Sequence, residues 1–86
     1  MKVFIPSPLR NYTNEQSEVD ASGSSLAELL NDLDMTYPGI RFRIIDEQDQ
    51  IRQHIKIFIN QLQVKDVNQF LNKDDKVLIV CALSGG

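Results

Sequence analysis

The amino-acid sequence predicts an α+β fold in which a mixed four- or five-stranded sheet carries one main helix packed across one face. Apolar residues recur at helical spacing between residues 25 and 37, and this stretch is the clearest helix of the chain. Several shorter stretches alternate apolar and polar residues, as half-buried strands do. The 86 residues leave room for one small domain, residues 1–86. Strands that accompany a single amphipathic helix bury its apolar stripe against one sheet face.

The predicted strands are short and differ in clarity. Residues 2–5 alternate at the start of the chain, and residues 17–21 form a weaker second strand. Residues 54–60 alternate cleanly, with isoleucine at every second position. Residues 61–64 suit a short returning strand, although the turn before them lacks glycine. The last strand is the apolar run 76–83.

The main helix has a start signal, an apolar stripe and a stop signal. Ser25 with Glu28 three residues later forms a capping-box pattern. The stripe consists of Leu26, Leu29, Leu30, Leu33 and Tyr37. Pro38 and Gly39 end the helix, since proline disfavours the helical conformation of the residue before it. A short second helical turn is expected through residues 39–45.

The remaining segments are predicted to connect these elements. Residues 7–16 are polar and rich in turn formers, and residues 46–50 form an acidic, solvated loop. Residues 67–72 are ambiguous between a helical turn and a loop. Residues 73–76 indicate a tight turn, because aspartate tolerates turn conformations.

Composition and charge favour a folded, soluble, cytoplasmic protein. The net charge of −3 argues against nucleic acid and against an anionic membrane surface as partners. The longest apolar run, residues 77–83, is far shorter than the roughly 20 residues that cross a bilayer. The first residues are too short and too interrupted by proline for a secretion signal. A single cysteine, Cys81, fits a reducing compartment.

The sequence has too few candidate nucleophiles, general bases and metal ligands for an enzyme active site. Cys81 is interpreted as a small buried apolar residue on the last strand, and His54 as a surface residue. One cysteine and one histidine cannot build a zinc site, so no metal ligand is assigned. The glycine before the main helix lacks the lysine of a phosphate-binding loop. No catalytic residue and no bound cofactor are predicted.

An apolar surface is expected on the sheet face opposite the main helix. Successive strand residues point to opposite faces of the sheet. If the isoleucines of residues 54–60 face the helix, the residues that alternate with the core positions on the strands point away from it. These outward residues are Phe4, Phe58, Leu78 and Val80. An exposed apolar patch of this size is typical of a protein-docking surface. The alternatives are that a loop covers the patch or that the strand phase is inverted.

The last residues favour chemistry on the carboxyl terminus. Gly85 and Gly86 have no side chains and can pass through a channel that any Cβ would block. A carboxylate on Gly86 is ionised at neutral pH and is a poor electrophile until ATP-dependent adenylation activates it. Leu83 and Ser84 would form the rest of a flexible tail, residues 83–86, outside the folded domain.

The order of these features resembles the MoaD/ThiS sulfur-carrier family, whose members are ubiquitin-like β-grasp proteins. The resemblance covers essentially the whole chain. Its most specific pieces are Gly85-Gly86, the helix end "YPGIR" and Asn60 at the end of the "IFIN" strand. The helix end is similar to the small subunit of molybdopterin synthase. The segment "RQHIKIFIN" resembles the carrier that feeds cysteine synthesis, so both pathways stay open.

The resemblance implies a mechanism and a set of partners. A ubiquitin-activating-type adenylyltransferase would use ATP to adenylate Gly86, and sulfur transfer would give a thiocarboxylate. A synthase would accept the sulfur, either the large subunit of molybdopterin synthase or an enzyme of the cysteine synthase type. The chain would be a protein co-substrate, or a non-catalytic synthase subunit. Conjugation to lysines through Gly86, as a ubiquitin-like modifier, is the alternative, and a plain interaction module is a third possibility.

Overall fold

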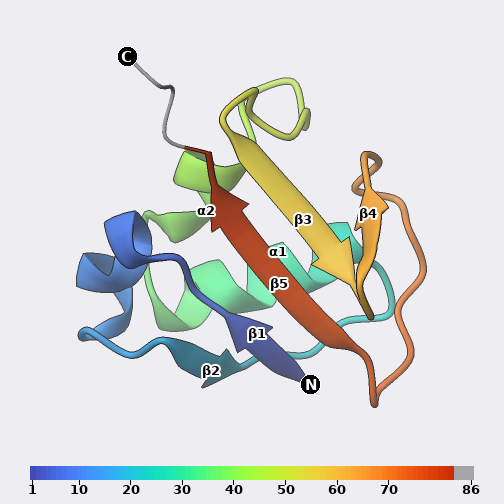
Figure 1. Cartoon of the computed structure of the whole chain (residues 1–86), viewed down its shortest axis with the longest axis horizontal. Coiled ribbons are helices and arrows are strands. Elements are labelled where there is room, and N and C mark those ends of the chain that lie inside the picture. Colours follow the sequence, from blue (N-terminus) through green and yellow to red (C-terminus); the bar gives the residue numbers. More distant parts are fainter. Residues whose placement is uncertain (83–86) are drawn as a thin grey trace.

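A computed structural model describes residues 1–82, and these residues form a five-stranded mixed sheet with a helix across one face (Figure 1). The strands are β1 (Lys2–Phe4), β2 (Glu18–Asp20), β3 (Ile55–Ile59), β4 (Leu62–Val64) and β5 (Lys76–Cys81). Their order is β2-β1-β5-β3-β4, with β1 and β5 parallel and the other neighbours antiparallel. The predicted α+β class is confirmed. The predicted tail, residues 83–86, lies outside the described residues.

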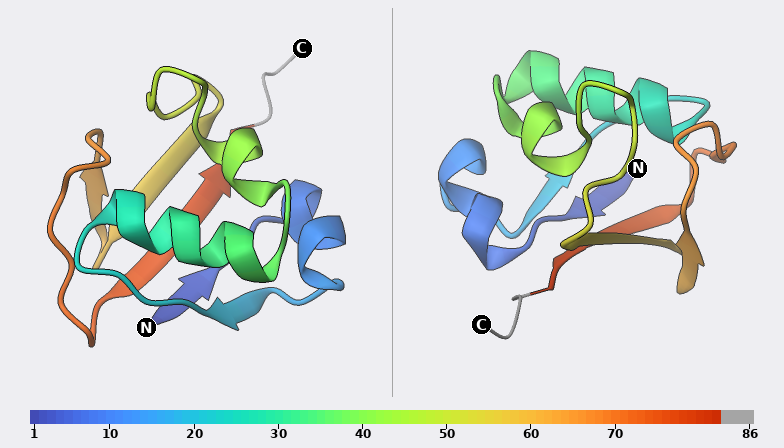
Figure 2. Two further views of the ribbon diagram at one scale, coloured as in Figure 1. Left: turned by 180° about the vertical axis from the view of Figure 1, so that it is seen from behind. Right: turned by 90° about the horizontal axis from the view of Figure 1, so that it is seen from above.

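The main helix, α1 (Leu26–Thr36), lies across the back of the sheet (Figure 2). Its start matches the prediction in part, because the Ser25 hydroxyl accepts a hydrogen bond from the Glu28 amide at 3.2 Å. The Glu28 carboxylate, however, accepts from the Ser24 amide at 3.1 Å, one residue earlier than a capping box requires. Within residues 1–82, no helix is long and apolar enough to span a membrane.

The chain turns after α1 into a second short helix, α2 (Ile40–Ile44), as predicted. Gly39 has a φ of 99°, a left-handed conformation that favours glycine. The Asp34 carboxylate accepts hydrogen bonds from the amides of Gly39 and Arg41, both at 3.0 Å. These bonds satisfy amides at the start of α2 that have no partner inside the helix.

The segment predicted as polar turns forms a 3-10 helix, η1 (Ser7–Thr13). Leu9 packs into the core and Thr13 is fully buried. The Thr13 hydroxyl donates to the carbonyls of Arg10 and Gln16, so the buried hydroxyl is satisfied. The prediction was wrong here because one leucine and one threonine among polar residues give no clear helical period.

β3 and β4 form a hairpin whose turn does not use glycine. Asn60 and Gln61 have φ angles of 51° and 74°, and they connect the paired residues Ile59 and Leu62. Two successive positive φ angles are typical of a type I′ turn, whose geometry suits the twist of a hairpin. Asparagine tolerates this conformation better than most residues, which explains how the returning strand forms.

The loop between β4 and β5 packs against the start of α1. The carbonyls of Val67 and Gln69 accept hydrogen bonds from the amides of Ala27 and Leu26, at 2.8 and 2.9 Å. Residues 67–72 are therefore a loop rather than a helical turn, and the loop satisfies amides at the helix start. The tight turn predicted at residues 73–76 is present, since the Asp75 amide donates to the Asn72 carbonyl at 2.9 Å.

The core lies between α1 and the facing side of the sheet. The helix contributes its predicted leucines, while Tyr37 lies beyond the helix end and is half-buried. The strands contribute their inward positions, which confirms the predicted phase. The core residues of these elements are Val3, Ile5, Val19, Ala21, Leu26, Leu29, Leu30, Leu33, Ile55, Ile57, Ile59, Val77 and Ile79.

Candidate functional site

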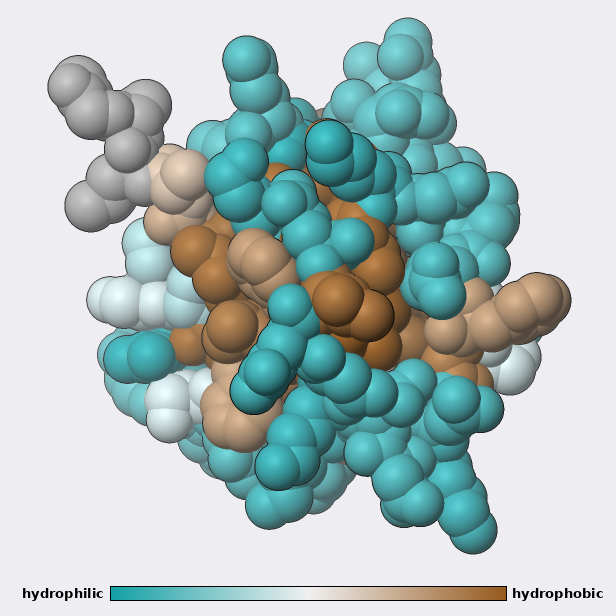
Figure 3. Space-filling view, turned by 45° about the vertical axis from the view of Figure 1, so that its right-hand side comes forward, coloured by the Kyte–Doolittle hydropathy of each residue, from teal (hydrophilic) through white to brown (hydrophobic). Residues whose placement is uncertain are grey.

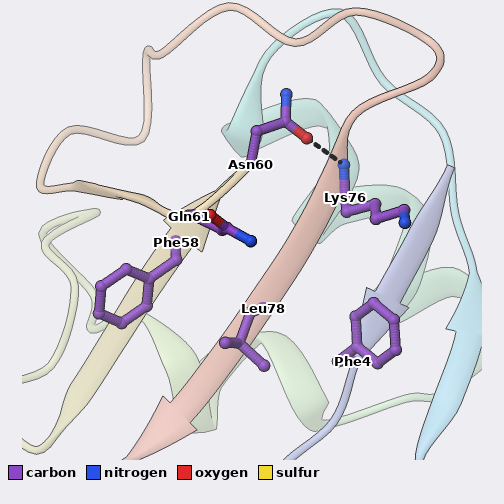
Figure 4. A pocket seen from close by; sticks show the side chains of 6 residues that line it. All are labelled: Phe4, Phe58, Asn60, Gln61, Lys76 and Leu78. Atoms are coloured by element: carbon purple, nitrogen blue, oxygen red, sulfur yellow. Dashed lines mark hydrogen bonds between the residues drawn. The ribbon is translucent and has the colours of Figure 1, made fainter.

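The sheet face opposite α1 carries an apolar row across its three central strands. Phe4 on β1 and Phe58 on β3 both pair in register with Leu78 on β5. Because successive strand residues point to opposite faces, burial of their neighbours in the core turns these three side chains outward. They line an open hollow of about 710 Å³ together with Asn60, Gln61 and Lys76 (Figure 4).

The apolar row is accessible to a partner. Leu78 is 43% exposed, whereas Phe4 and Phe58 are half-buried against their neighbours. Val80 shares this face two positions further along β5 and is half-buried, but it does not line the hollow. Figure 3 shows hydrophobic side chains gathered on the surface within a hydrophilic surround. The structure thus puts all four predicted residues on one face and brings three of them around one hollow.

A hydrogen-bonded clamp supports one end of the hollow. Asn60 Oδ1 accepts from the Lys76 amide at 3.0 Å, and Asn60 Nδ2 donates to Asp75 Oδ1 at 2.7 Å. Asp75 Oδ2 in turn accepts from the Asn72 amide at 2.7 Å. Asp75 is 9% exposed, so these bonds satisfy a carboxylate that is largely withdrawn from water. The clamp holds the β3–β4 turn against the start of β5.

The sequence pattern does not reveal this clamp as part of the site. Asn60 stands out as a motif residue, and the Asp74-Asp75 pair indicates a turn. The pairing joins residues 15 positions apart, and neither local period nor turn chemistry predicts such a contact. The sequence feature that could have indicated the clamp is the amide side chain of Asn60 at the end of one strand together with the carboxylate of Asp75 just before the next long strand.

β5 connects the hollow to the carboxyl end of the chain. It pairs with β1 on one side and β3 on the other, which makes it the central strand. The Ala82 amide donates to the His54 carbonyl at 2.7 Å, so the pairing continues to the end of the described residues. The predicted tail residues Leu83, Ser84, Gly85 and Gly86 lie beyond that point and outside the described part of the chain.

Cys81 and His54 border a second hollow of about 390 Å³ beside η1 and α2. Cys81 packs against the core and is half-buried, rather than fully buried as predicted. Burial raises the pKa of the Cys81 thiol, whereas reactive cysteines need a lowered pKa. His54 is exposed, in agreement with the predicted surface position. Within residues 1–82, no three residues of the metal-binding types gather into a site.

The sheet order, the helix across one face and the central strand that leads to the carboxyl end define a ubiquitin-like β-grasp protein. The sequence pattern of the ThiS family matches residues 3–86, which is nearly the whole chain. The chain belongs to the ThiS family, and its predicted membership of the ubiquitin-like sulfur carriers is confirmed.

Known relatives agree with this family. The sulfur carrier protein CysO of Mycobacterium tuberculosis is 33% identical over 89 aligned positions, which cover 98% of this chain and 96% of CysO. The crystal structure of M. tuberculosis CysO, an antigen, matches with a TM-score of 0.90 at 30% identity, covering 95% of this chain and 98% of that chain. A chain of the Amycolatopsis orientalis BexX/CysO complex matches with a TM-score of 0.92 at 26% identity, covering 99% and 98%.

A more distant structure shares the fold. The small archaeal modifier protein 1 of Methanosarcina acetivorans has a TM-score of 0.80 at 24% identity, covering 99% of this chain and 94% of that chain. The family and the carrier name of the CysO relatives confirm the prediction that the chain is a protein carrier rather than an enzyme.

Proposed function

We propose that this chain carries sulfur as a thiocarboxylate on Gly86 and donates it in cysteine biosynthesis. The main support is the ThiS-family match, which extends through residue 86 and so includes the glycine pair. The relatives named sulfur carrier protein CysO favour the cysteine pathway over molybdopterin synthesis, the other pathway that the sequence resembles. The sulfur acceptor is then an enzyme of the cysteine synthase type rather than the large subunit of molybdopterin synthase.

The proposed chemistry takes place on one carboxylate. A ubiquitin-activating-type adenylyltransferase transfers AMP from ATP to the carboxylate of Gly86, and pyrophosphate leaves. Hydrosulfide then attacks the acyl carbon, AMP leaves, and loss of the S–H proton gives the thiocarboxylate. Adenylation is needed because a carboxylate with a pKa of about 3.3–3.7 is ionised at neutral pH and resists attack. The carrier binds no cofactor, and ATP is a substrate of the partner.

The site divides into a docking part and a tail. Phe4, Phe58, Leu78 and Val80 bind the partner, and the face they share supports this assignment. Leu83, Ser84 and Gly85 enter the partner's active site and present Gly86 there. A complex of a CysO with a protein named BexX supports partner binding by carriers of this kind.

The cytoplasm is the proposed compartment. ATP-dependent activation needs a cytoplasmic supply of ATP, and the free thiol of Cys81 is compatible with reducing conditions.

A second function is conjugation to target lysines through an isopeptide bond at Gly86. The observation that favours it is the fold shared with small archaeal modifier protein 1. Both functions need the same adenylation step, so they differ only in the nucleophile that displaces AMP.

The test is a reconstitution with purified adenylyltransferase, ATP, a sulfur source, a cysteine-synthase-type acceptor and an O-activated serine, whose leaving group the sulfur displaces. The full chain is expected to support ATP-dependent formation of cysteine, whereas a chain that lacks Gly86 is expected to support none. Circular dichroism of the Gly86-deleted chain is the matched control for folding. Sulfur delivery by the Gly86-deleted chain would overturn the mechanism, and ATP-dependent attachment to other proteins without sulfur transfer would favour the modifier function.

A further inference from the structure

The sheet face opposite α1, which carries the apolar row and is called the docking face below, has a charge pattern opposite to that of the whole chain. The chain has 12 acidic and nine basic residues, yet the outward charged residues of the three central strands are all lysines. Lys2 on β1 and Lys76 on β5 pair in register beside the apolar row, and Lys56 on β3 lies on its other side, opposite Val80. Among the described strands, the carboxylates on this face are Glu18 and Asp20 of the edge strand β2, which flank the buried Val19.

Two of these lysines are available to a partner. Lys2 Nζ already contacts the Glu18 carboxylate of β2 at 2.9 Å, and this bond raises the pKa of Lys2. Within residues 1–82, neither Lys56 nor Lys76 forms an ion pair, and both are exposed. Figure 4 shows the Lys76 side chain extending from β5 toward β1, at the end of the hollow that holds the Asn60 clamp.

The register of the strands sets the spacing of these two charges. Lys56 lies opposite Val80, which is four residues beyond Lys76 on β5. At about 3.3 Å per residue, the two lysines are separated by about 13 Å along the strand direction. The apolar row of Phe4, Leu78 and Phe58 crosses the sheet between them.

We infer that this face binds a partner surface that presents an apolar centre flanked on both sides by carboxylates. The inference rests on the proposed function, in which the first partner is the adenylyltransferase. Lysine is depleted in interface centres and common at polar rims, which fits positions at the two ends of an apolar row. Complementary rim charges speed association and select the partner, while the apolar centre supplies most of the affinity.

The test compares Lys56→Gln and Lys76→Gln with Lys73→Gln. Lys73 is an exposed lysine in the turn before β5, so its replacement removes the same charge outside the strands. Binding to a purified adenylyltransferase is measured by isothermal titration calorimetry at low and at high salt. Each face variant is expected to weaken binding by about two- to fivefold at low salt, and the difference is expected to shrink at high salt. Lys73→Gln is expected to bind like the unmodified chain.

Unchanged binding of both face variants at low salt would overturn the inference, and so would an equal loss in Lys73→Gln. Formation of the thiocarboxylate by the unmodified chain is followed in the same samples at saturating enzyme. Salt-dependent binding through Lys56 and Lys76 without thiocarboxylate formation would support the inference while overturning the proposed function. Normal thiocarboxylate formation with binding that does not depend on Lys56 or Lys76 would support the proposed function and overturn the inference. Absence of any binding to the adenylyltransferase would overturn both the inference and the proposed function.

Discussion

Ile57 and Phe58 are neighbours on β3, and their replacement by alanine is expected to affect two different properties, stability and partner binding. Ile57 is fully buried, and it lies opposite Ile79 on β5 and Val64 on β4. Phe58 points away from the core into the hollow on the docking face. Ile57→Ala is therefore expected to destabilise the fold, and Phe58→Ala is expected to weaken partner binding.

The size of the Ile57→Ala effect follows from its burial. The change removes about three methylene-sized groups, each worth about 0.8 kcal/mol, which gives about 2.4 kcal/mol. The cavity left behind adds to this, so the expected loss in free energy of unfolding is about 3–4 kcal/mol. Phe58 is half-buried on an open face, and its replacement is expected to cost about 1 kcal/mol of stability.

Urea unfolding followed by circular dichroism measures both variants, with the slope m checked for constancy. Titration of the adenylyltransferase measures binding, for which Phe58→Ala is expected to lose about tenfold or more, as truncated aromatic anchors do. A Phe58→Ala variant less stable than Ile57→Ala would show that the assignment of the two sheet faces is inverted. A loss below about 1 kcal/mol in Ile57→Ala would refute the cavity argument.

Three further changes test the clamp, the helix start and the thiol. Asn60→Ala is expected to lower the free energy of unfolding in urea by about 1–3 kcal/mol, because it leaves the largely buried Asp75 carboxylate short of a hydrogen bond. Asn60→Asp keeps the shape of the side chain but loses the donor, so it should not restore this stability. Hydrogen bonds from the Ser24 amide and hydroxyl lower the pKa of Glu28 from 4.5, so Glu28 favours folding above that pH and this contribution is lost as the pH falls through the lowered pKa. Glu28→Gln should flatten the acid limb of the stability profile, and an unchanged limb would contradict the assignment. Since burial raises the pKa of the Cys81 thiol, iodoacetamide should alkylate it more slowly than free cysteine at pH 8 and faster as the pH rises; a rate above that of free cysteine would contradict this.

Local patterns predict much of this fold because its main elements have strong periods. The leucine stripe and Ser25 mark α1, and the isoleucines of β3 mark both the strand and its buried face. The same period-2 pattern predicts the docking face, since the residues between core positions must point outward. Phe4, Phe58, Leu78 and Val80 all lie on that face.

Contacts between distant segments account for what the sequence does not predict. η1 is stabilised by burial of Leu9 and Thr13, not by a local pattern. The loop carbonyls that bind the start of α1 come from Val67 and Gln69, some 40 residues away in sequence. The clamp on Asn60 depends on Asp75 in the same way, so the polar end of the hollow emerges only once the sheet is assembled.

The proposed thiocarboxylate on Gly86 can be tested by the intact mass of the chain. After incubation with the adenylyltransferase, ATP and a sulfur source, exchange of oxygen for sulfur is expected to add about 16 Da, and fragmentation should assign the added mass to the last residue. Omission of ATP should leave the mass unchanged. A chain whose mass does not change with an adenylyltransferase that binds it, or whose added mass lies on Cys81, would contradict the account.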